Sequence, residues 1–323
     1  MWTAIFLATL IAAGVGAYGA WAAHAVAQGA AIWPFVLGLP LAYLAVPFLI
    51  TGLWVTMGWR MRAPRPTDKV LGWRARVRLF VNEFLALAQS APKMILYRWL
   101  VRDPAPAPAS LPVLLVHGVG CNAGVWYGLK GYLEAQRLGP VYAISYGPPL
   151  APIEHFADQM AQKIATMRDA TGATQVVLVG HSMGGLVNLA YLRRYGGAAV
   201  REMIAIGTPF HGSRHAYMMF GAAMQDLRPG SRFLAPIDDP GAFASGVPVV
   251  SIWSWHDSMV TPQTSSRLDW AENIAIAGVA HNALLGDRDV WARVAAEIRK
   301  ARDRVPAPQP VAEASASLGS SRC

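Results

Sequence analysis

The hydrophobic pattern divides the chain into an uncharged beginning and a mixed remainder. Between Met1 and Trp59 there is no Asp, Glu, Lys or Arg. A membrane-spanning helix needs about 20 apolar residues, and two such lengths fit, near 2–23 and 32–57, with a short turn between them. A secretory signal peptide would have a basic start and one short apolar core. We therefore predict a transmembrane helical hairpin over residues 1–59.

Positive charge begins directly after this apolar segment. Lys and Arg next to membrane helices stay on the cytoplasmic side, so both termini and the rest of the chain are predicted in the cytoplasm, at an inner membrane crossed by two helices. The same side chains either bind anionic lipid headgroups or only set the topology. They are Arg60, Arg62, Arg65, Lys69, Arg74, Arg76 and Arg78.

Residues 60–102 form a basic segment that contains an amphipathic pattern. Apolar residues between 77 and 88 recur with helical spacing. Such a helix lies either on the membrane surface or against the rest of the protein. A proline-rich linker follows at 103–110, and the Pro-, Ala- and Ser-rich residues 305–323 are predicted to be disordered.

Residues 111–304 alternate between short apolar runs and helical patterns. The runs predict strands at 112–117, 141–146, 175–180, 200–207, 247–253 and 273–278, and helices are predicted at 153–168, 184–195 and 289–304. This alternation is typical of a mostly parallel sheet with helices on both faces, an α/β fold. The Met-rich stretch 216–224 lies in a segment, about 210–245, that is either a lid-like insertion or plain packing.

Composition adds limits on partners and compartment. The net charge is +9, yet the basic residues form no module with interleaved aromatics, so nucleic acid is not a predicted partner. Membrane lipids are predicted partners. The cysteines are Cys121 and Cys323. Because Cys323 ends the predicted tail, no structural disulfide is expected, in agreement with a reducing compartment.

A G-x-S-x-G motif supplies a candidate nucleophile. Gly180-His-Ser182-Met-Gly184 stands between a predicted strand and a predicted helix, which is the context that a nucleophile turn requires. The glycines permit a sharp, strained turn that exposes the serine hydroxyl at a helix N-terminus. Developing negative charge is stabilised there, so Ser182 is the predicted nucleophile.

A nucleophilic serine needs a base and an orienting acid, which follow it in the chain order Ser, acid, His. His281 comes just after the last predicted strand and is the predicted base. Asp257 follows the preceding strand and is the predicted acid, with Asp269 as the second choice. The weaker candidates are His211, His215 and His256 among bases, and Asp226, Asp238 and Asp239 among acids.

Two backbone N–H groups are predicted to form an oxyanion hole. One belongs to Met183, directly after the nucleophile, and the other comes from the loop after the first strand, where Val119 follows His117-Gly118. His117 is expected to order this loop. Cys121 lies in the same loop but lacks the turn that would expose a nucleophile.

With these residues in place, the chain resembles bacterial lipases and esterases of the α/β-hydrolase fold. The resemblance covers residues 111–304 and rests on His117-Gly118, on Gly180–Gly185, on Gly207-Thr-Pro-Phe-His-Gly-Ser213 and on the segment 226–234. It implies hydrolysis of carboxylic esters, with acyl lipids as substrates. The uncharged N-terminal segment differs from secreted lipases, which carry a cleaved signal.

The predicted reaction has two acyl-transfer steps through an acyl-enzyme and needs no metal or organic cofactor. Trp126, Met218 and Met219 either line an acyl pocket or fill the core. The alternatives are a thioesterase or amidase of the same fold, or a non-catalytic membrane scaffold with a relic site. The sequence does not predict the oligomeric state.

Overall fold

A computed structural model of the protein describes residues 2–239, 241 and 246–304. The tail predicted to be disordered, 305–323, lies outside the described residues, as does part of the lid-like segment at 240 and 242–245.

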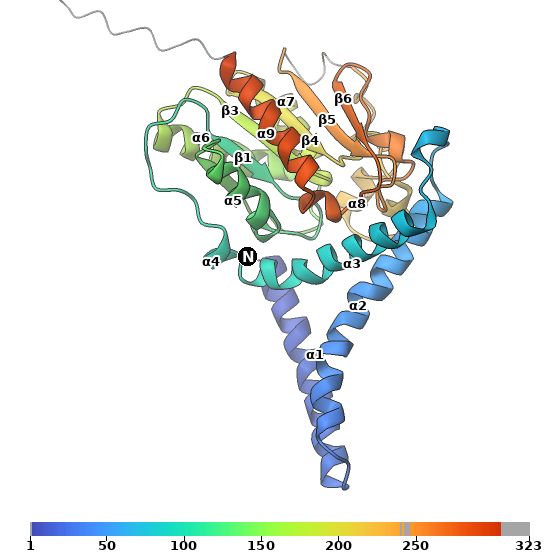
Figure 1. Ribbon diagram of the computed structural model, residues 1–323. Helices are drawn as coiled ribbons and strands as arrows, with labels where there is room; N and C mark the ends of the chain where they lie inside the picture. The colour runs from blue at the N-terminus through green and yellow to red at the C-terminus, as the bar shows by residue number, and fades with distance from the viewer. Residues whose placement is uncertain (1, 240, 242–245, 305–323) are drawn as a thin grey trace, which may run out of the picture.

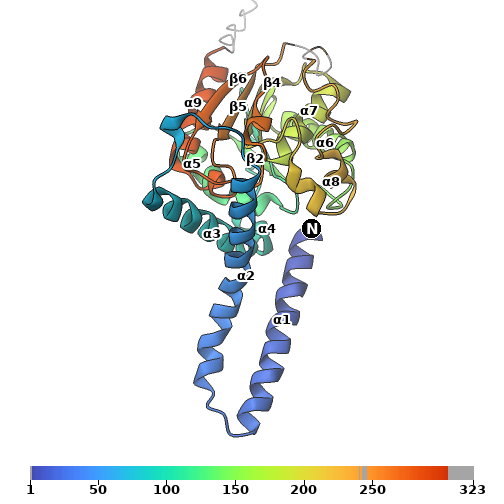
Figure 2. The same cartoon turned by 90° about the vertical axis from the view of Figure 1, so that its right-hand side faces the viewer.

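Two long helices leave the rest of the protein as a hairpin. Helix α1 covers Trp2–Ala27 and helix α2 covers Trp33–Arg60, and they meet at the turn and diverge toward the α/β part (Figures 1 and 2). Each is long and apolar enough to cross a membrane. Many of their large apolar side chains are exposed, including Phe6, Leu10, Trp33, Leu41 and Leu49. In water this surface would be unfavourable.

Helix α3, Trp73–Ile95, crosses the base of the α/β part where the hairpin begins (Figure 1). It follows a short helical turn, Thr67–Lys69, and precedes α4, Tyr97–Leu100. One face of α3 is buried through Leu79, Glu83 and Met94. The predicted helix is therefore present, and it packs against the rest of the protein.

The centre of the protein is a sheet of six parallel strands in the order β2-β1-β3-β4-β5-β6. All six strands predicted from the apolar runs are present. They are β1 Val113–Val116, β2 Val141–Ile144, β3 Val176–His181, β4 Val200–Ile206, β5 Val249–Ser254 and β6 Glu272–Ile276.

Both faces of the sheet are covered because the strands are apolar on both sides. In β1, Leu114 and Val116 join the core under α6 (Ile153–Thr171) and α7 (Met183–Tyr195). Val113 and Leu115 join the opposite core under α5 (Tyr127–Ala135) and α9 (Arg288–Asp303). Side chains of a strand alternate between its faces, so an uninterrupted apolar run indicates a strand buried on both sides. The predicted α/β fold is confirmed.

Short elements connect the strands. Among them are the helical turns Ala123–Trp126, Arg214–Met218, Gln263–Ser266 and Ala283–Leu285, and the helix α8, Ala222–Asp226. In parallel sheets, sites form beyond the carboxyl ends of the strands. That edge here carries Ser182 after β3, Asp257 after β5 and His281 after β6.

Candidate active site

Ser182 occupies a strained turn between β3 and α7. Its backbone lies at φ 54° and ψ −129°, a region that side-chain-bearing residues rarely adopt. Glycine is required beside it: a Cβ at Gly180 would come within 2.6 Å of Gly184, and a Cβ at Gly184 would collide with the carbonyl of Val116. The turn is held by a hydrogen bond from Ser182 N to Ile206 O at 2.9 Å.

Asp257 and His281 form a buried pair. His281 Nδ1 lies 2.8 Å from Asp257 Oδ2. The other carboxylate oxygen, Oδ1, accepts hydrogen bonds from Met259 N at 2.8 Å and from Val260 N at 2.7 Å. Because an ionised carboxylate only accepts hydrogen bonds, this arrangement assigns the proton to Nδ1 and leaves Nε2 as the free base.

The pKa of His281 reflects two opposing effects. Burial lowers it, but the charge and the hydrogen bond of Asp257 raise it, with a smaller contribution from Glu83, so that the pKa lies above the ordinary value of 6.5. Protonated His281 is therefore stabilised by the carboxylate beside it, as a base that accepts a serine proton requires.

Ser182 and His281 line the same small cavity, about 190 Å³ in volume. Its wall includes Trp54 from α2 and three residues from α3, so the N-terminal helices complete the site. Thr3 in the first turn of α1 does not line the cavity, but it donates a hydrogen bond at 3.2 Å to the backbone oxygen of Cys121, which does. The cavity is lined by Trp54, Leu87, Ser90, Met94, Gly118, Val119, Gly120, Cys121, Val125, His181, Ser182, Met259, His281, Asn282 and Leu285.

The predicted oxyanion residues flank the serine. Val119 lines the cavity, and a Cβ on the preceding Gly118 would come within 2.9 Å of Ser182 Cβ. Met183 begins α7, and the first N–H groups of a helix have no intrahelical acceptor. Both backbone groups thus lie on the turn and loop that surround the hydroxyl.

The loop that carries Val119 is fixed by His117 and Tyr146. Their rings stack with centroids 4.0 Å apart, and the Tyr146 hydroxyl donates to His117 O. Burial lowers the pKa of His117 to about 4, so the imidazole is neutral. Burial also raises the pKa of the Cys121 thiol to about 12, which leaves little thiolate to act as a nucleophile.

The weaker candidate bases are engaged elsewhere. His211 Nε2 lies 2.8 Å from Asp238, at the surface. His215 Nδ1 lies 2.9 Å from the Thr261 hydroxyl. His256 Nδ1 accepts a hydrogen bond from Gly278 N at 3.0 Å.

The second-choice acid, Asp269, is exposed and lies 3.9 Å from Arg267, and Asp226 accepts a hydrogen bond from Ile153 N at 2.9 Å. Of the acids compared, Asp257 is the one that bonds His281. Within residues 2–239, 241 and 246–304, no group of three or more His, Cys, Asp or Glu side chains is arranged to hold a metal ion.

The residues considered for an acyl pocket do not line this cavity, although the ring of Trp126 packs edge-on against His181, which does. Trp126 is fully buried in the core on the α5 and α9 side. Met219 packs against the other core, and Met218 is 47% exposed. None of the three lines the cavity at Ser182. Of the two alternatives, an acyl pocket or the core, the structure favours core packing for Trp126 and Met219.

One residue near the site was not singled out by the sequence. Glu83 of α3 is 1% exposed. Its carboxylate accepts hydrogen bonds from Ser258 Oγ at 2.8 Å, from Asn282 N at 3.2 Å and Nδ2 at 2.9 Å, and from Ala283 N at 2.9 Å. These donors belong to the two loops that carry Asp257 and His281. The periodicity of the apolar residues predicted this helix. It did not indicate which groups the carboxylate of Glu83 would bind.

The end of α2 also contacts the loop of Asp257. Gln263 Nε2 donates to Asp257 O at 2.9 Å and to Gly58 O at 3.3 Å, and Gln263 Oε1 accepts from Ala63 N at 3.1 Å. A Cβ at Gly58 would come within 2.8 Å of Ser258 O. The N-terminal helices are thus joined to the loops of the buried pair by specific contacts.

Comparison with known proteins gives matches over part of the chain. The model of the alpha/beta hydrolase family matches residues 113–319. The human (lyso)-N-acylphosphatidylethanolamine lipase is 29% identical over 120 residues, 35% of each chain. The triacylglycerol lipase of Pseudarthrobacter phenanthrenivorans is 32% identical over 127 residues, 34% of this chain and 36% of that protein. The matched segment thus spans about a third of these relatives.

The fold also matches solved structures. Aspergillus fumigatus lipase B superposes with a TM-score of 0.54 at 20% identity, covering 64% of this chain and 57% of the other. At this identity the likeness concerns the fold alone.

Proposed function

Because the chain belongs to the alpha/beta hydrolase family, we propose that it is a serine hydrolase that cleaves carboxylic esters. Ser182 is the nucleophile, His281 the base and Asp257 the acid that orients it. The observation that carries this proposal is the 2.8 Å bond between Asp257 and His281, beside a serine that lines the same cavity from a strained turn.

These roles define the proposed reaction. His281 Nε2 takes the proton of Ser182 as the hydroxyl oxygen attacks the ester carbonyl, and the protonated imidazole then gives that proton to the departing alcohol. Water repeats the sequence on the acyl-enzyme and releases the acid. Asp257 holds the tautomer and stabilises the imidazolium.

The N–H groups of Val119 and Met183 bind the oxygen that becomes negative in each step. An oxyanion-hole donor contributes about 3 kcal/mol to lowering the barrier. Since these donors are backbone groups fixed by the turn and by the His117 loop, they need no rearrangement as charge develops.

The hairpin anchors the enzyme in a membrane. Its helices are long and apolar, and their residues are mostly unburied by protein, which favours lipid as their surroundings. The basic residues that follow α2 favour a cytoplasmic catalytic domain. With the ends farthest from the turn of the hairpin, α2 contributes Trp54 to the cavity wall and α1 bonds the backbone of Cys121 in the loop beside it (Figure 2).

Acyl lipids suit the cavity. Much of its wall is apolar, with Trp54, Leu87, Met94 and Leu285 among the lining residues, and it lies against the helices proposed to be in the membrane. The ester group of a lipid could lie next to Ser182 while its acyl chain contacts apolar side chains. The two relatives compared above are both lipases, which agrees with this class of substrate.

The test uses the full-length protein in neutral detergent micelles. A fluorophosphonate probe should label the wild type and not Ser182→Ala. Ser90→Ala and Cys121→Ala are the controls, because both side chains line the same cavity and both variants should still be labelled. Matched acyl esters, thioesters and amides then define the bond that is cleaved. Labelling of folded Ser182→Ala, or none of folded wild type, would overturn the proposal.

A further inference from the structure

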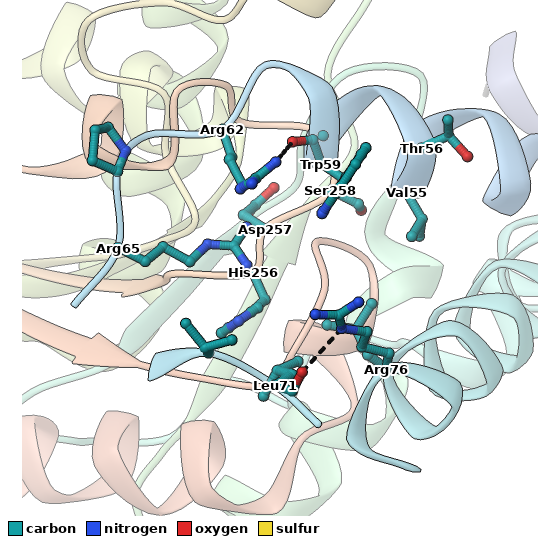
Figure 3. Close-up of a pocket in the computed structure, with 14 residues that line it drawn as sticks. Val55, Thr56, Trp59, Arg62, Arg65, Leu71, Arg76, His256, Asp257 and Ser258 are labelled. Atoms are coloured by element: carbon teal, nitrogen blue, oxygen red, sulfur yellow. Dashed lines mark hydrogen bonds between the residues drawn. The ribbon is translucent and has the colours of Figure 1, made fainter. Parts of the chain in front are cut away.

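A second, larger cavity lies behind the Asp257 loop, away from Ser182. Its volume is about 510 Å³. It is enclosed by the end of α2, by the connection 61–72, by the start of α3 and by residues 256–258 (Figure 3). The reaction proposed for Ser182 uses none of this space.

Three guanidinium groups face this cavity. Arg62 and Arg65 enter from the connection after α2, and Arg76 enters from α3 on the other side (Figure 3). Arg62 Nη1 donates to Trp59 O at 2.6 Å, and Arg76 Nε donates to Leu71 O at 2.9 Å. Each guanidinium has five N–H donors, so most of them remain available.

The positive charge here lacks a matching anion. In the part of the chain that the structure describes, none of these three arginines forms an ion pair. The Nε–H of Arg65 is buried without an acceptor, an arrangement that normally costs stability. Burial, followed by repulsion from Arg62 and Arg76, lowers the pKa of Arg65.

The other polar groups in the wall neutralise only part of this charge. Asp257 contributes to the lining, but its carboxylate oxygens are bound to His281 and to the N–H groups of Met259 and Val260. Burial lowers the pKa of His256 to about 4, with Arg65 and Arg76 adding to the effect. His256 is therefore neutral, and the lining carries three guanidinium charges against the single carboxylate charge of Asp257, so the cavity stays net positive.

We propose that this cavity binds a phosphate group. Several guanidiniums around one space suit a phosphate, because the planar fork of Arg matches two phosphate oxygens at once. The volume exceeds that of a bare phosphate and lies in the range of cavities that hold whole small molecules, so a phosphate ester fits.

The wall of the cavity also indicates where such an ester comes from. Val55, Thr56 and Trp59 of α2 line it and end the helix proposed to cross the membrane. In the proposed membrane orientation, this end of α2 lies at the depth of the lipid headgroups. A soluble phosphate ester has the same recognised chemistry, and the test separates the two.

The experiment measures the unfolding midpoint of the full-length protein in neutral detergent at constant ionic strength. The probes are di-O-hexylglycerol phosphate, di-O-hexylglycerol and glycerol 3-phosphate; the ether lipids contain no ester for Ser182 to cleave. We expect the phosphate-bearing lipid to raise the midpoint saturably, by about 4–10 °C at high occupancy, and the phosphate-free lipid to have no such effect.

Variants locate the binding site. Arg65→Gln and Arg76→Gln should weaken binding at least about tenfold, a loss of about 1.4 kcal/mol. Arg65→Lys keeps the charge but not the fork and should have an intermediate effect. Arg78→Gln is the matched control, since it removes the same charge from α3 outside the cavity. The midpoint without ligand and labelling by fluorophosphonate report whether each variant folds.

Each outcome decides the question. Saturable binding of the lipid phosphate alone assigns a lipid source, and equal binding of glycerol 3-phosphate assigns a soluble one. No saturable shift with either phosphate would refute the site, as would equal weakening by Arg76→Gln and Arg78→Gln, which would indicate diffuse attraction. None of these results depends on ester hydrolysis, so they leave the proposal for Ser182 unaffected.

Discussion

The carboxylate of Glu83 receives both the backbone and the side-chain N–H groups of Asn282, at 3.2 Å and 2.9 Å. Asn282 directly follows His281, so a helix far away in the sequence holds the loop of the proposed base. The same carboxylate oxygen accepts from Ser258 Oγ at 2.8 Å, next to Asp257. Helix α3 is therefore a structural part of the proposed active site.

Glu83→Gln is expected to lower kcat by about tenfold to a hundredfold, the size of effect that follows a shift of about 1 Å in a catalytic group. The amide keeps the volume but places an NH₂ group among donors. It also removes a charge that raises the pKa of His281, so the acidic limb of kcat/KM should move to lower pH. Asp169→Asn, exposed on α6, is the control. A reduced rate with an unmoved limb would mean that Glu83 acts on structure alone.

The pH dependence of the wild type follows from His281. The imidazole must be neutral to accept a proton, and its pKa is raised above 6.5. Activity should therefore rise with pH through an apparent pKa above 6.5. The stability that protonated His281 contributes is present below 6.5 and is lost as pH rises through the folded-state value.

Asp257→Asn should lower kcat by about 10⁴-fold, as in other triads in which the wrong tautomer results. The measurement is kcat and kcat/KM against pH for folded protein. Near-normal turnover by this variant would exclude Asp257 as the orienting acid.

Two glycines of α2 provide a matched pair. A Cβ at Gly58 would come within 2.8 Å of Ser258 O, whereas a Cβ at Gly52 meets nothing within 4 Å. We expect Gly58→Ala to destabilise the contact between α2 and the Asp257 loop by about 1–3 kcal/mol and to reduce activity. Gly52→Ala should be neutral or slightly stabilising. Thermal unfolding and ester hydrolysis, measured together, test both; equal behaviour would argue against a tight contact at Gly58.

Trp54 should determine how acyl chains are accepted. Its ring lines the cavity at Ser182 and contacts the ring of His215, with centroids 5.1 Å apart. Trp54→Ala removes an apolar wall, so kcat/KM should fall about tenfold or more for long-chain esters and much less for acetate esters. Trp33→Ala, at the other end of α2, is the control. A uniform loss across chain lengths would point to misfolding of the site.

The membrane topology has its own test. A fluorescent protein fused after residue 304 should fluoresce in the cytoplasm, and alkaline phosphatase fused at Gly29, in the turn of the hairpin, should be active outside the inner membrane. Phosphatase activity from the fusion after residue 304 would invert the orientation proposed here.

The sheet and the nucleophile turn were predictable because their signals are local. Strands such as β1 are apolar at every position, since both faces are covered, and Gly180 and Gly184 precede and follow Ser182 for steric reasons visible in the pattern. His281 could be chosen because chain order and the last strand limit where a base can lie. Asp257 followed from the strand before it.

Contacts between distant segments were not predictable. The helical periodicity of 77–88 fits a membrane-surface helix and a packed helix equally well, because periodicity defines a face and not its partner. The role of Glu83 depends on donors about 175 to 200 positions away. Trp126 could not be assigned to a pocket or to the core from its type, since an aromatic side chain suits both.

Trp54 of α2 lines the cavity at Ser182, and Thr3 of α1 bonds the backbone of Cys121 in its wall, so both ends of the hairpin lie next to the proposed catalytic cavity. The membrane-anchored hydrolase proposed here would meet its substrate in two dimensions. Its rate would then follow the mole fraction of substrate in the bilayer and not the bulk concentration, and diluting the bilayer with inert lipid would slow turnover even at a fixed amount of substrate.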